Sequence, residues 1–248
     1  MTDRPTVLVP IRILEGETLP EGLSDLLANA HVVLLGYHVV PDQTAPGQAR
    51  MQFEERASDL LSALEEMLES AGATVDSQLV FTHRKQQTLD RKIREHDCLA
   101  VVVPGATKAP EDILVAVRGT VGSDRIARVV AGLFAGTGAS VTLYHLAGEG
   151  ETEQDAETML TAVRDRLVEL GTDDTAVSTR IERHRRPRKA IADAATSYDA
   201  LVMGESSPSL ATFVFGMTAE EVAEQFLGPV IVVQREKPPA EADEQEQS

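Results

Sequence analysis

Two arginines end apolar runs at corresponding places in the sequence, and each could bind an anion. Arg12 closes the run that begins at Leu8, and Arg118 closes the similar run that begins at Leu114. A planar guanidinium binds a carboxylate or a phosphate through two parallel hydrogen bonds. If both runs are strands of parallel sheets, both arginines lie at the carboxyl edge, where open α/β sheets bind ligands. The alternative is an intramolecular salt bridge, since the chain has 40 acidic residues.

Other groups of reactive side chains point to no particular chemistry. The six histidines show no metal-ligand spacing, and neither a Gly-x-Ser-x-Gly elbow nor a GxxxxGK[ST] loop occurs. The sequence therefore predicts no catalytic residue and no metal site. The basic segment 183–189 either docks an acidic or phosphorylated partner or is a loop balanced by nearby carboxylates. The single cysteine, Cys98, adjoins the apolar run 99–103 and is expected to be a buried, unpaired thiol.

Composition excludes two large classes of function. The 248 residues carry 23 basic and 40 acidic side chains, a formal charge of −17, and only 4% are aromatic, which argues against nucleic-acid binding. No apolar run approaches the roughly 18 residues of a membrane span, and the first residues do not resemble a signal peptide, so we expect a cytoplasmic protein. Only five of the basic residues are lysines. This balance suits a high-salt, halophilic cytoplasm, with an ordinary acidic protein as the alternative.

Short apolar runs alternate with stretches of helical periodicity, a pattern typical of βαβ units and a parallel sheet. In the first part of the chain the expected strands span residues 6–14, 31–40, 73–81 and 98–103. The expected helices between them span residues 20–30, 51–70 and 88–96. These elements would place Arg12 at the end of the first strand.

The pattern then restarts as a diverged repeat. Tyr37-His38 is echoed by Tyr144-His145, at nearly the same offset that separates the two arginines. The second copy is expected to have strands at 114–118, 139–146, 176–182 and 200–203 and helices at 123–135, 156–170 and 187–197, with Ser123 as an N-cap. It then adds a helix at 218–226 and a strand at 229–234.

Nine residues, 104–112, cannot hold that last helix and strand in the first copy. We therefore expect a truncated domain at 1–111, a complete domain at 112–235 and a disordered acidic tail at 236–248.

The end of the second copy resembles the universal stress protein family. The likeness rests on Val202-Met203-Gly204, the segment 215–222 and the last strand at 229–233; ILVAVRG at 113–119 and LYHL at 143–146 resemble the family's first two strands. The resemblance implies an α/β fold of two tandem adenine-nucleotide-hydrolase-like (Rossmann-like) open parallel sheets, the first lacking its last helix and strand. It indicates the tandem-domain form of haloarchaeal type.

Many members of this family bind ATP through a Gly-x-x-Gly, nine residues, Gly-Ser/Thr pattern, in which glycine lets backbone amides approach phosphate. Met203 and Gly204 match the start of this motif. Ser207 stands in place of the second glycine, Gly216 comes one residue early, and Thr218 is one helical step beyond the hydroxyl position. The motif is therefore degenerate.

The resemblance also implies an aspartate at the end of the first strand of an ATP-binding member. Here Arg118 takes that place, Arg12 takes it in the first copy, and Leu146 takes the contact position on the second strand. We therefore expect no bound cofactor, with ATP or another nucleotide as a remote alternative.

These expectations favour a non-enzymatic stress-response or partner-regulating protein with a largely lost ATP site. One alternative is a sensor that binds a nucleotide or another anion at Arg118, Gly204 and Gly216. Another is an accessory subunit of a membrane transporter, and a weaker one is a nucleotide-hydrolysing enzyme. The apolar strand 229–234 has no obvious partner within the chain, so we expect a homodimer through it.

Overall fold

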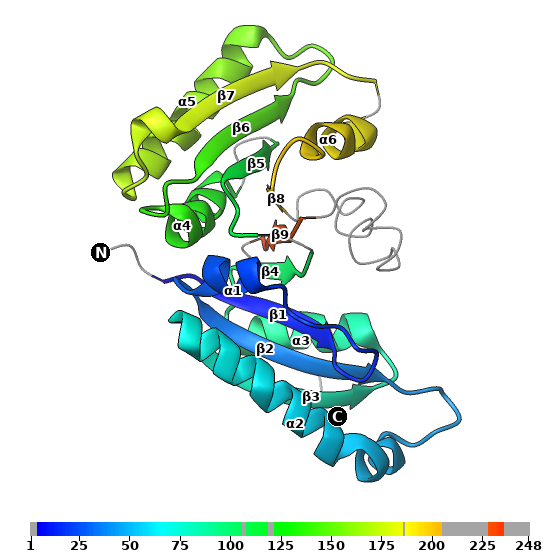
Figure 1. Ribbon diagram of the computed structural model, residues 1–248. Helices are drawn as coiled ribbons and strands as arrows, with labels where there is room; N and C mark the ends of the chain where they lie inside the picture. Colours follow the sequence, from blue (N-terminus) through cyan, green and yellow to red (C-terminus); the bar gives the residue numbers. More distant parts are fainter. Residues whose placement is uncertain (1–3, 106–107, 119–121, 186, 205–227, 236–248) are drawn as a thin grey trace, which may run out of the picture.

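We describe a computed structural model that covers residues 4–105, 108–118, 122–185, 187–204 and 228–235. Its described strands form one nine-stranded sheet in the order β3-β2-β1-β4-β9-β8-β5-β6-β7 (Figure 1). The strands are β1 (Thr6–Arg12), β2 (His31–Val39), β3 (Thr74–Thr82), β4 (Ala100–Val103), β5 (Asp112–Val117), β6 (Ser140–Leu146), β7 (Val177–Glu182), β8 (Ala200–Gly204) and β9 (Val230–Val233). The helices are α1 (Glu21–Leu27), α2 (Pro46–Ala71), α3 (Lys85–Glu95), α4 (Ser123–Phe134), α5 (Glu153–Glu169) and α6 (Pro187–Ala195).

The expectation of two separate sheets is wrong, because β9 joins the two halves of the chain. We call β1–β4 with their helices the first half and β5–β9 with theirs the second half. Strand β9 runs parallel to β8 and antiparallel to β4, with Val230 opposite Val103 and Val233 opposite Ala100. In Figure 1, β9 lies between β4 of the first half, below it, and β8 of the second half, above it. The α/β class and the mostly parallel pairing agree with the sequence expectation.

The same pairing removes the reason for expecting a dimer through 229–234. That expectation required β9 to be a free edge, but β8 and β4 occupy its two sides. The outer strands of the sheet are β3 and β7. A second copy could pair with β9 only after β4 had been displaced.

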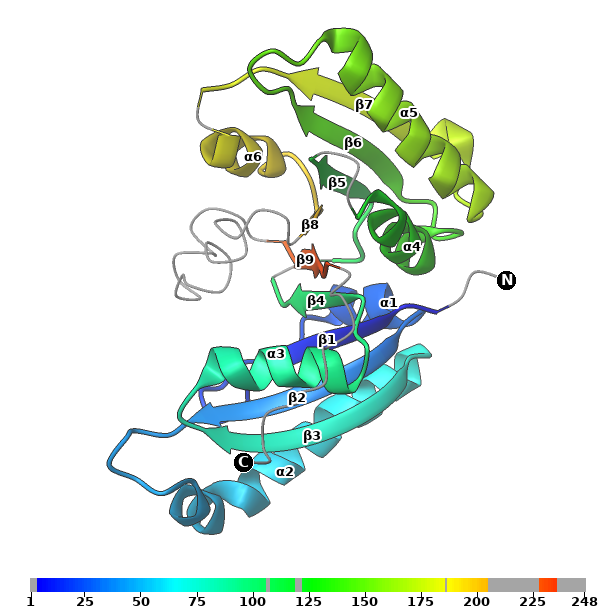
Figure 2. The same ribbon diagram turned by 180° about the vertical axis from the view of Figure 1, so that it is seen from behind.

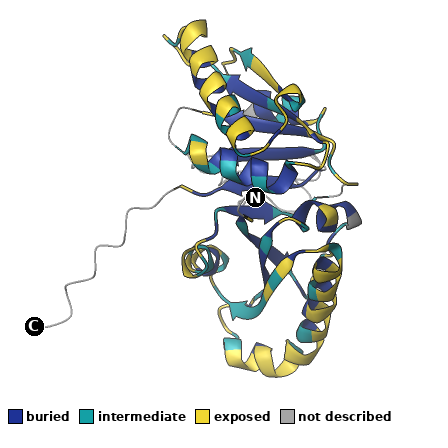
Figure 3. Cartoon of the chain, turned by 90° about the vertical axis from the view of Figure 1, so that its left-hand side faces the viewer, coloured by how far each residue is buried: buried dark blue, intermediate teal, exposed yellow. Residues whose placement is uncertain are grey.

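One face of the sheet carries a core that continues through both halves. Side chains of α1, α2, α4 and α5 pack there against alternate residues of the strands, such as Val9, Val102, Val115 and Ile231. On the opposite face, α3 covers the first half and α6 covers the second half in two smaller clusters. Figure 2 shows α3 in front of the first-half strands, and Figure 3 shows the buried strands between helices whose outer sides are exposed.

Helix ends account for several departures from the expected boundaries. Helix α2 begins at Pro46, five residues earlier than expected, because proline fits the first helical position, and it ends at Gly72, whose φ of 109° is the left-handed conformation that favours glycine. Helix α5 begins with a capping box between Thr152 and Asp155. The expected N-cap Ser123 is wrong by one residue, since Gly122 caps α4 without a side-chain hydrogen bond.

Three further expectations concern the connections and the chain end. The described residues between β4 and β5 contain no helix or strand. Over the described part of the chain, no helix has both the length and the apolar character needed to cross a membrane. The expected helix at 218–226 and the acidic tail at 236–248 lie outside the described residues.

Candidate functional site

Four of the expected ligand residues meet at the carboxyl edge of the second half. Arg118 directly follows β5, and the register places Val117 beside His145 and Ala116 beside Met203. Leu146 and Gly204 are the last residues of β6 and β8, so they lie at this same edge. The parallel pairing of the three strands therefore brings Arg118, Leu146, Met203 and Gly204 together. The other three expected ligand residues, Ser207, Gly216 and Thr218, lie outside the described residues.

The side chains at this edge differ in what they can offer a ligand. Met203 is only 3% exposed and belongs to the apolar cluster under α6, and Leu146 packs against that cluster. Arg118 is exposed, and within the described part of the chain it forms neither a hydrogen bond nor an ion pair. It is therefore a free cation at the ligand edge, as far as the described residues extend.

The corresponding arginine of the first half has intramolecular partners. Arg12 Nη1 lies 2.9 Å from Glu15 Oε2, and Arg12 Nε lies 3.6 Å from Glu17 Oε2. The backbone N–H of Arg12 also donates to Glu17 Oε2 at 2.5 Å. Acidic residues of the loop after β1 thus take the place that an external anion would occupy, which confirms the salt-bridge alternative for Arg12.

A second cation stands beside Arg12 at the first-half edge. Lys85 Nζ lies 5.4 Å from the centre of the Tyr37 ring, within reach of a cation–π interaction. Burial lowers the pKa of Lys85, and the neighbouring charge of Arg12 lowers it further. Burial likewise raises the pKa of the Tyr37 hydroxyl, and the charge of Glu17 adds to that effect. At this edge, two cations lie close to the carboxylates of Glu15 and Glu17. These carboxylates occupy the position in which an external anion could bind.

The two edges face opposite directions along the sheet. Because β4 and β9 are antiparallel, the carboxyl ends of β1–β4 point away from those of β5, β6 and β8. Arg12 and Arg118 therefore cannot bind one ligand together.

The buried side chain of His145 lies at the second-half edge, and the sequence did not indicate it as part of a site. His145 is 3% exposed, and its Nδ1 and Nε2 lie 2.9 Å from the Val117 carbonyl oxygen and 2.9 Å from Glu151 Oε1. Glu151 Oε2 accepts a hydrogen bond from the Gly148 N–H at 2.8 Å. His38, its sequence counterpart, instead lies 6.0 Å from the rings of Phe53 and Phe81. The repeated Tyr-His pair predicted that His38 and His145 occupy corresponding positions, but only the structure shows that their contacts differ.

Part of the basic segment 183–189 has a structural role. Arg183 donates to the carbonyl oxygens of Gly148 and Glu151, at 3.2 and 2.5 Å, and so holds the loop that follows β6. Just before it, Glu182 accepts from the Tyr144 hydroxyl at 2.8 Å and from the Arg180 guanidinium. These contacts favour the interpretation of Arg183 as part of a structural loop.

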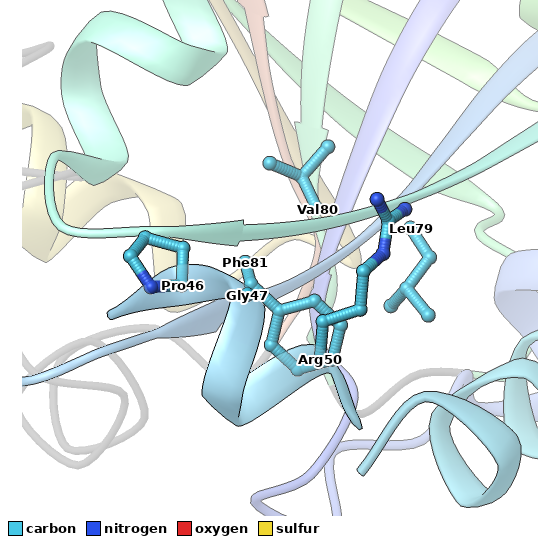
Figure 4. A pocket seen from close by; sticks show the side chains of 6 residues that line it. All are labelled: Pro46, Gly47, Arg50, Leu79, Val80 and Phe81. Carbon is cyan, nitrogen blue, oxygen red and sulfur yellow. The ribbon is translucent and has the colours of Figure 1, made fainter. Parts of the chain in front are cut away.

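A shallow groove of about 260 Å³ lies elsewhere, between the start of α2 and the end of β3 (Figure 4). Apolar residues dominate its lining, and its one cation, Arg50, pairs with Glu54 at 3.0 Å. Since β3 is the far edge of the first half, this groove is separate from the edge at Arg118. The described residues contain no group of three or more potential ligands that could hold a metal ion.

Comparison with known proteins identifies the family of the second half and the fold of the whole. Residues 110–234 match the model of the universal stress protein family. A universal stress protein from Archaeoglobus fulgidus DSM 4304 aligns with a TM-score of 0.61 and 18% identity over 93% of this chain and 96% of that one. A functionally unknown protein from Pseudomonas aeruginosa PAO1 aligns with a TM-score of 0.50 and 17% identity over 94% of each chain. No curated protein matches the sequence. At these identities the structural likeness shows the fold alone.

Proposed function

Because the chain belongs to the universal stress protein family, we propose that it is a non-enzymatic stress-response module that regulates a partner protein in the cytoplasm. In this proposal the chain is a tandem member of the family, with a truncated first copy and a degenerate ATP site. The family match over 110–234 supports the stress-response role.

The observation that carries the loss of the ATP site is the position of Arg118. Its guanidinium follows β5 at the edge where ATP-binding members are expected to present an aspartate. A cation there cannot accept the hydrogen bonds that an adenine or ribose would donate to a carboxylate. The neighbouring Leu146 adds an apolar side chain at the second contact position. Together these residues remove the acceptors that the family's usual ligand needs.

Thermal melting with nucleotides tests this proposal. A ligand present at 100 times its Kd adds about 2.7 kcal/mol of stability. In molar KCl we expect millimolar ATP to leave the melting temperature unchanged. A clear upward shift with ATP that Gly204→Val abolishes would contradict the proposal. If no nucleotide shifts the melting temperature and a membrane protein co-purifies with the chain, the alternative of an accessory subunit of a membrane transporter is favoured over regulation of a cytoplasmic partner.

A sensor for a small anion is the second candidate, and the free guanidinium of Arg118 favours it. Within the described residues Arg118 has no ion pair, whereas Arg12 is held by two glutamates. An exposed arginine at the carboxyl edge of a parallel sheet can bind a phosphate through two hydrogen bonds.

Pyrophosphate is a suitable probe for the sensor candidate. Its stabilising effect should be lost in Arg118→Ala, be reduced in Arg118→Lys, which keeps the charge but not the planar pair of donors, and persist in the matched control Arg12→Ala. An equal shift in wild type and Arg118→Ala would exclude Arg118 as the anion-binding residue.

A further inference from the structure

The last turns of α3 carry more positive charge than their own carboxylate neutralises. Arg91, Lys92 and Arg94 lie close together in this part of the helix. Glu95 is the partner of two of them, because its carboxylate lies 2.6 Å from Lys92 Nζ and 3.6 Å from Arg91 Nε. The side chain of Arg94 is exposed and, within the described residues, has neither a hydrogen bond nor an ion pair. This end of α3 therefore presents positive charge to solvent.

A positive surface is unusual in this chain. Residues 84–97 hold five basic and three acidic side chains, a net charge of +2 (5 − 3), whereas the whole chain carries −17. Of the two acids besides Glu95, Asp90 accepts from Gln86 at 3.1 Å and Asp97 is exposed just after the helix. The inner side of α3 packs on the sheet through Leu89, and the helix lies in front of the first-half strands in Figure 2. The arginines are therefore on its solvent side.

The chain leaves β9 beside this same end of α3. The N–H of Gln234, directly after β9, donates to the carbonyl oxygen of Leu99 at 2.8 Å. The residue before Leu99, Cys98, donates from its own N–H to the Ile93 carbonyl oxygen in α3 at 2.9 Å. Arg235 is the last described residue. The residues that follow it therefore start close to the end of α3 that carries Arg94.

The acidic tail, residues 236–248, has the charge and the length to cover this surface. It holds five acidic residues and one lysine, and four of the acids fall within 241–246. An extended chain of this length spans up to about 45 Å. Helix α3, with 11 residues, is about 16 Å long. The tail thus starts beside α3, is long enough to reach along it and carries the opposite charge.

We propose that the acidic tail docks on the exposed side of α3 in its own chain, with the carboxylates of 241–246 against Arg91 and Arg94. One exposed ion pair shifts an equilibrium by at most about fivefold, so several pairs act together. The covalent link helps, because it keeps the local concentration of the tail in the millimolar range. Salt weakens the docking, since exposed charges are screened beyond about 3 Å at 1 M. The docking goes beyond the proposed function, because it requires neither a partner nor a nucleotide.

Paramagnetic relaxation in nuclear magnetic resonance spectra tests the docking in the full chain. A nitroxide attached to Ala242→Cys lies among the tail carboxylates, and the native cysteine, Cys98, is buried and does not compete for the label. Spectra are recorded at the lowest KCl concentration that preserves the folded protein. We expect the label to broaden the amide signals of α3 strongly and those of α2, on the opposite face of the sheet, weakly. Equal broadening of the two helices would overturn the proposal.

An uncharged tail of the same length separates docking from mere closeness to α3. The labelled variant with Glu241→Gln, Asp243→Asn, Glu244→Gln and Glu246→Gln keeps the starting point and the length of the tail but removes four charges. The relaxation enhancement over α3 should fall at least about fivefold, the most that a single exposed ion pair contributes. An uncharged tail that broadens α3 as strongly as the acidic tail would contradict docking by charge.

Arg94→Gln tests the other side of the contact, and Arg56→Gln is its matched control. Arg56 is also an exposed arginine of a first-half helix, but it belongs to α2. Broadening of α3 should weaken in Arg94→Gln and stay at the wild-type level in Arg56→Gln, so equal effects would exclude Arg94 as a contact. If Arg94→Gln does not fold, the uncharged tail still decides. Broadening of nitrogen-15-labelled protein by separate, spin-labelled copies would identify a second copy as the occupant and overturn docking within one chain.

Discussion

Residues of one type, at matching places in the two halves, have different partners and therefore different roles. Arg12 is neutralised by Glu15 and Glu17, whereas Arg118 is exposed and has no ion pair within the described residues. His38 and His145 likewise differ, the first lying near aromatic rings and the second between two oxygen atoms. The chemistry of each of these residues is thus decided by its neighbours rather than by its place in the sequence pattern.

Cys98 provides a prediction about reactivity. Its side chain is 1% exposed, and burial raises the pKa of the thiol to about 12, with a smaller contribution from the charge of Asp97. Because only the thiolate is nucleophilic, the native protein at pH 8 should not react with a disulfide reagent over an hour. In denaturant one thiol per chain should react at once. Stoichiometric labelling of the native protein would show that the β4 region opens readily.

The sequence located some members of the candidate site and missed others for a physical reason. Arg118, Leu146, Met203 and Gly204 end apolar runs, and parallel pairing places all such ends at one edge. Glu151 is in a polar loop of an acid-rich chain, where no pattern distinguishes it from its neighbours. Its pairing with His145 depends on how that loop folds back over β6, which only the structure shows.

At the scale of elements, hydrophobic periodicity predicted each described α-helix and strand, with small errors at the ends, but not the short 3-10 helix Asp174–Ala176. The largest error was the start of α2, since Pro46 follows a turn and was not recognised as a first helical residue. The ends depend on caps, which are local and can be tested one at a time.

The capping box of α5 gives a prediction at this scale. Thr152 accepts from the Asp155 N–H at 3.1 Å, and the Thr152 N–H donates to the Asp155 carboxylate at 3.2 Å. Replacing Thr152 with alanine should lower the free energy of unfolding by about 1 kcal/mol. The control Thr161→Ala, exposed within the same helix, should be neutral or slightly stabilising, because alanine favours helix. Chemical denaturation measures both, and equal effects would contradict the capping role.

At the scale of the whole molecule, β9 makes one sheet and one core from two halves. The sequence could not predict this pairing, because Val230–Val233 is a short apolar strand that fits any apolar neighbour. Its partner β4 is more than 120 residues away in the chain (230 − 103 = 127). We therefore expect the halves to unfold together.

Gly22 offers a test of the contact between α1 and the connection that joins the halves. A Cβ at this position would lie 2.1 Å from the backbone carbon of Lys108, so the connection would have to move. Gly22→Ala should cost about 2–3 kcal/mol, at the upper end for an overpacked site. Gly47→Ala, in open space at the start of α2, should be neutral or stabilising. The two free energies of unfolding, measured in denaturant, check this. A Gly22→Ala variant as stable as Gly47→Ala would mean that α1 does not touch the connection.

We propose that this member of the universal stress protein family no longer binds ATP. The most direct test is the amount of ATP that remains bound to the protein after purification. Protein isolated in molar KCl without added nucleotide is denatured, and the released small molecules are quantified by chromatography and mass spectrometry. We expect far less than one ATP per chain, with Arg118→Ala no different in ATP content. Release of one ATP per chain by the wild-type protein would contradict the claim.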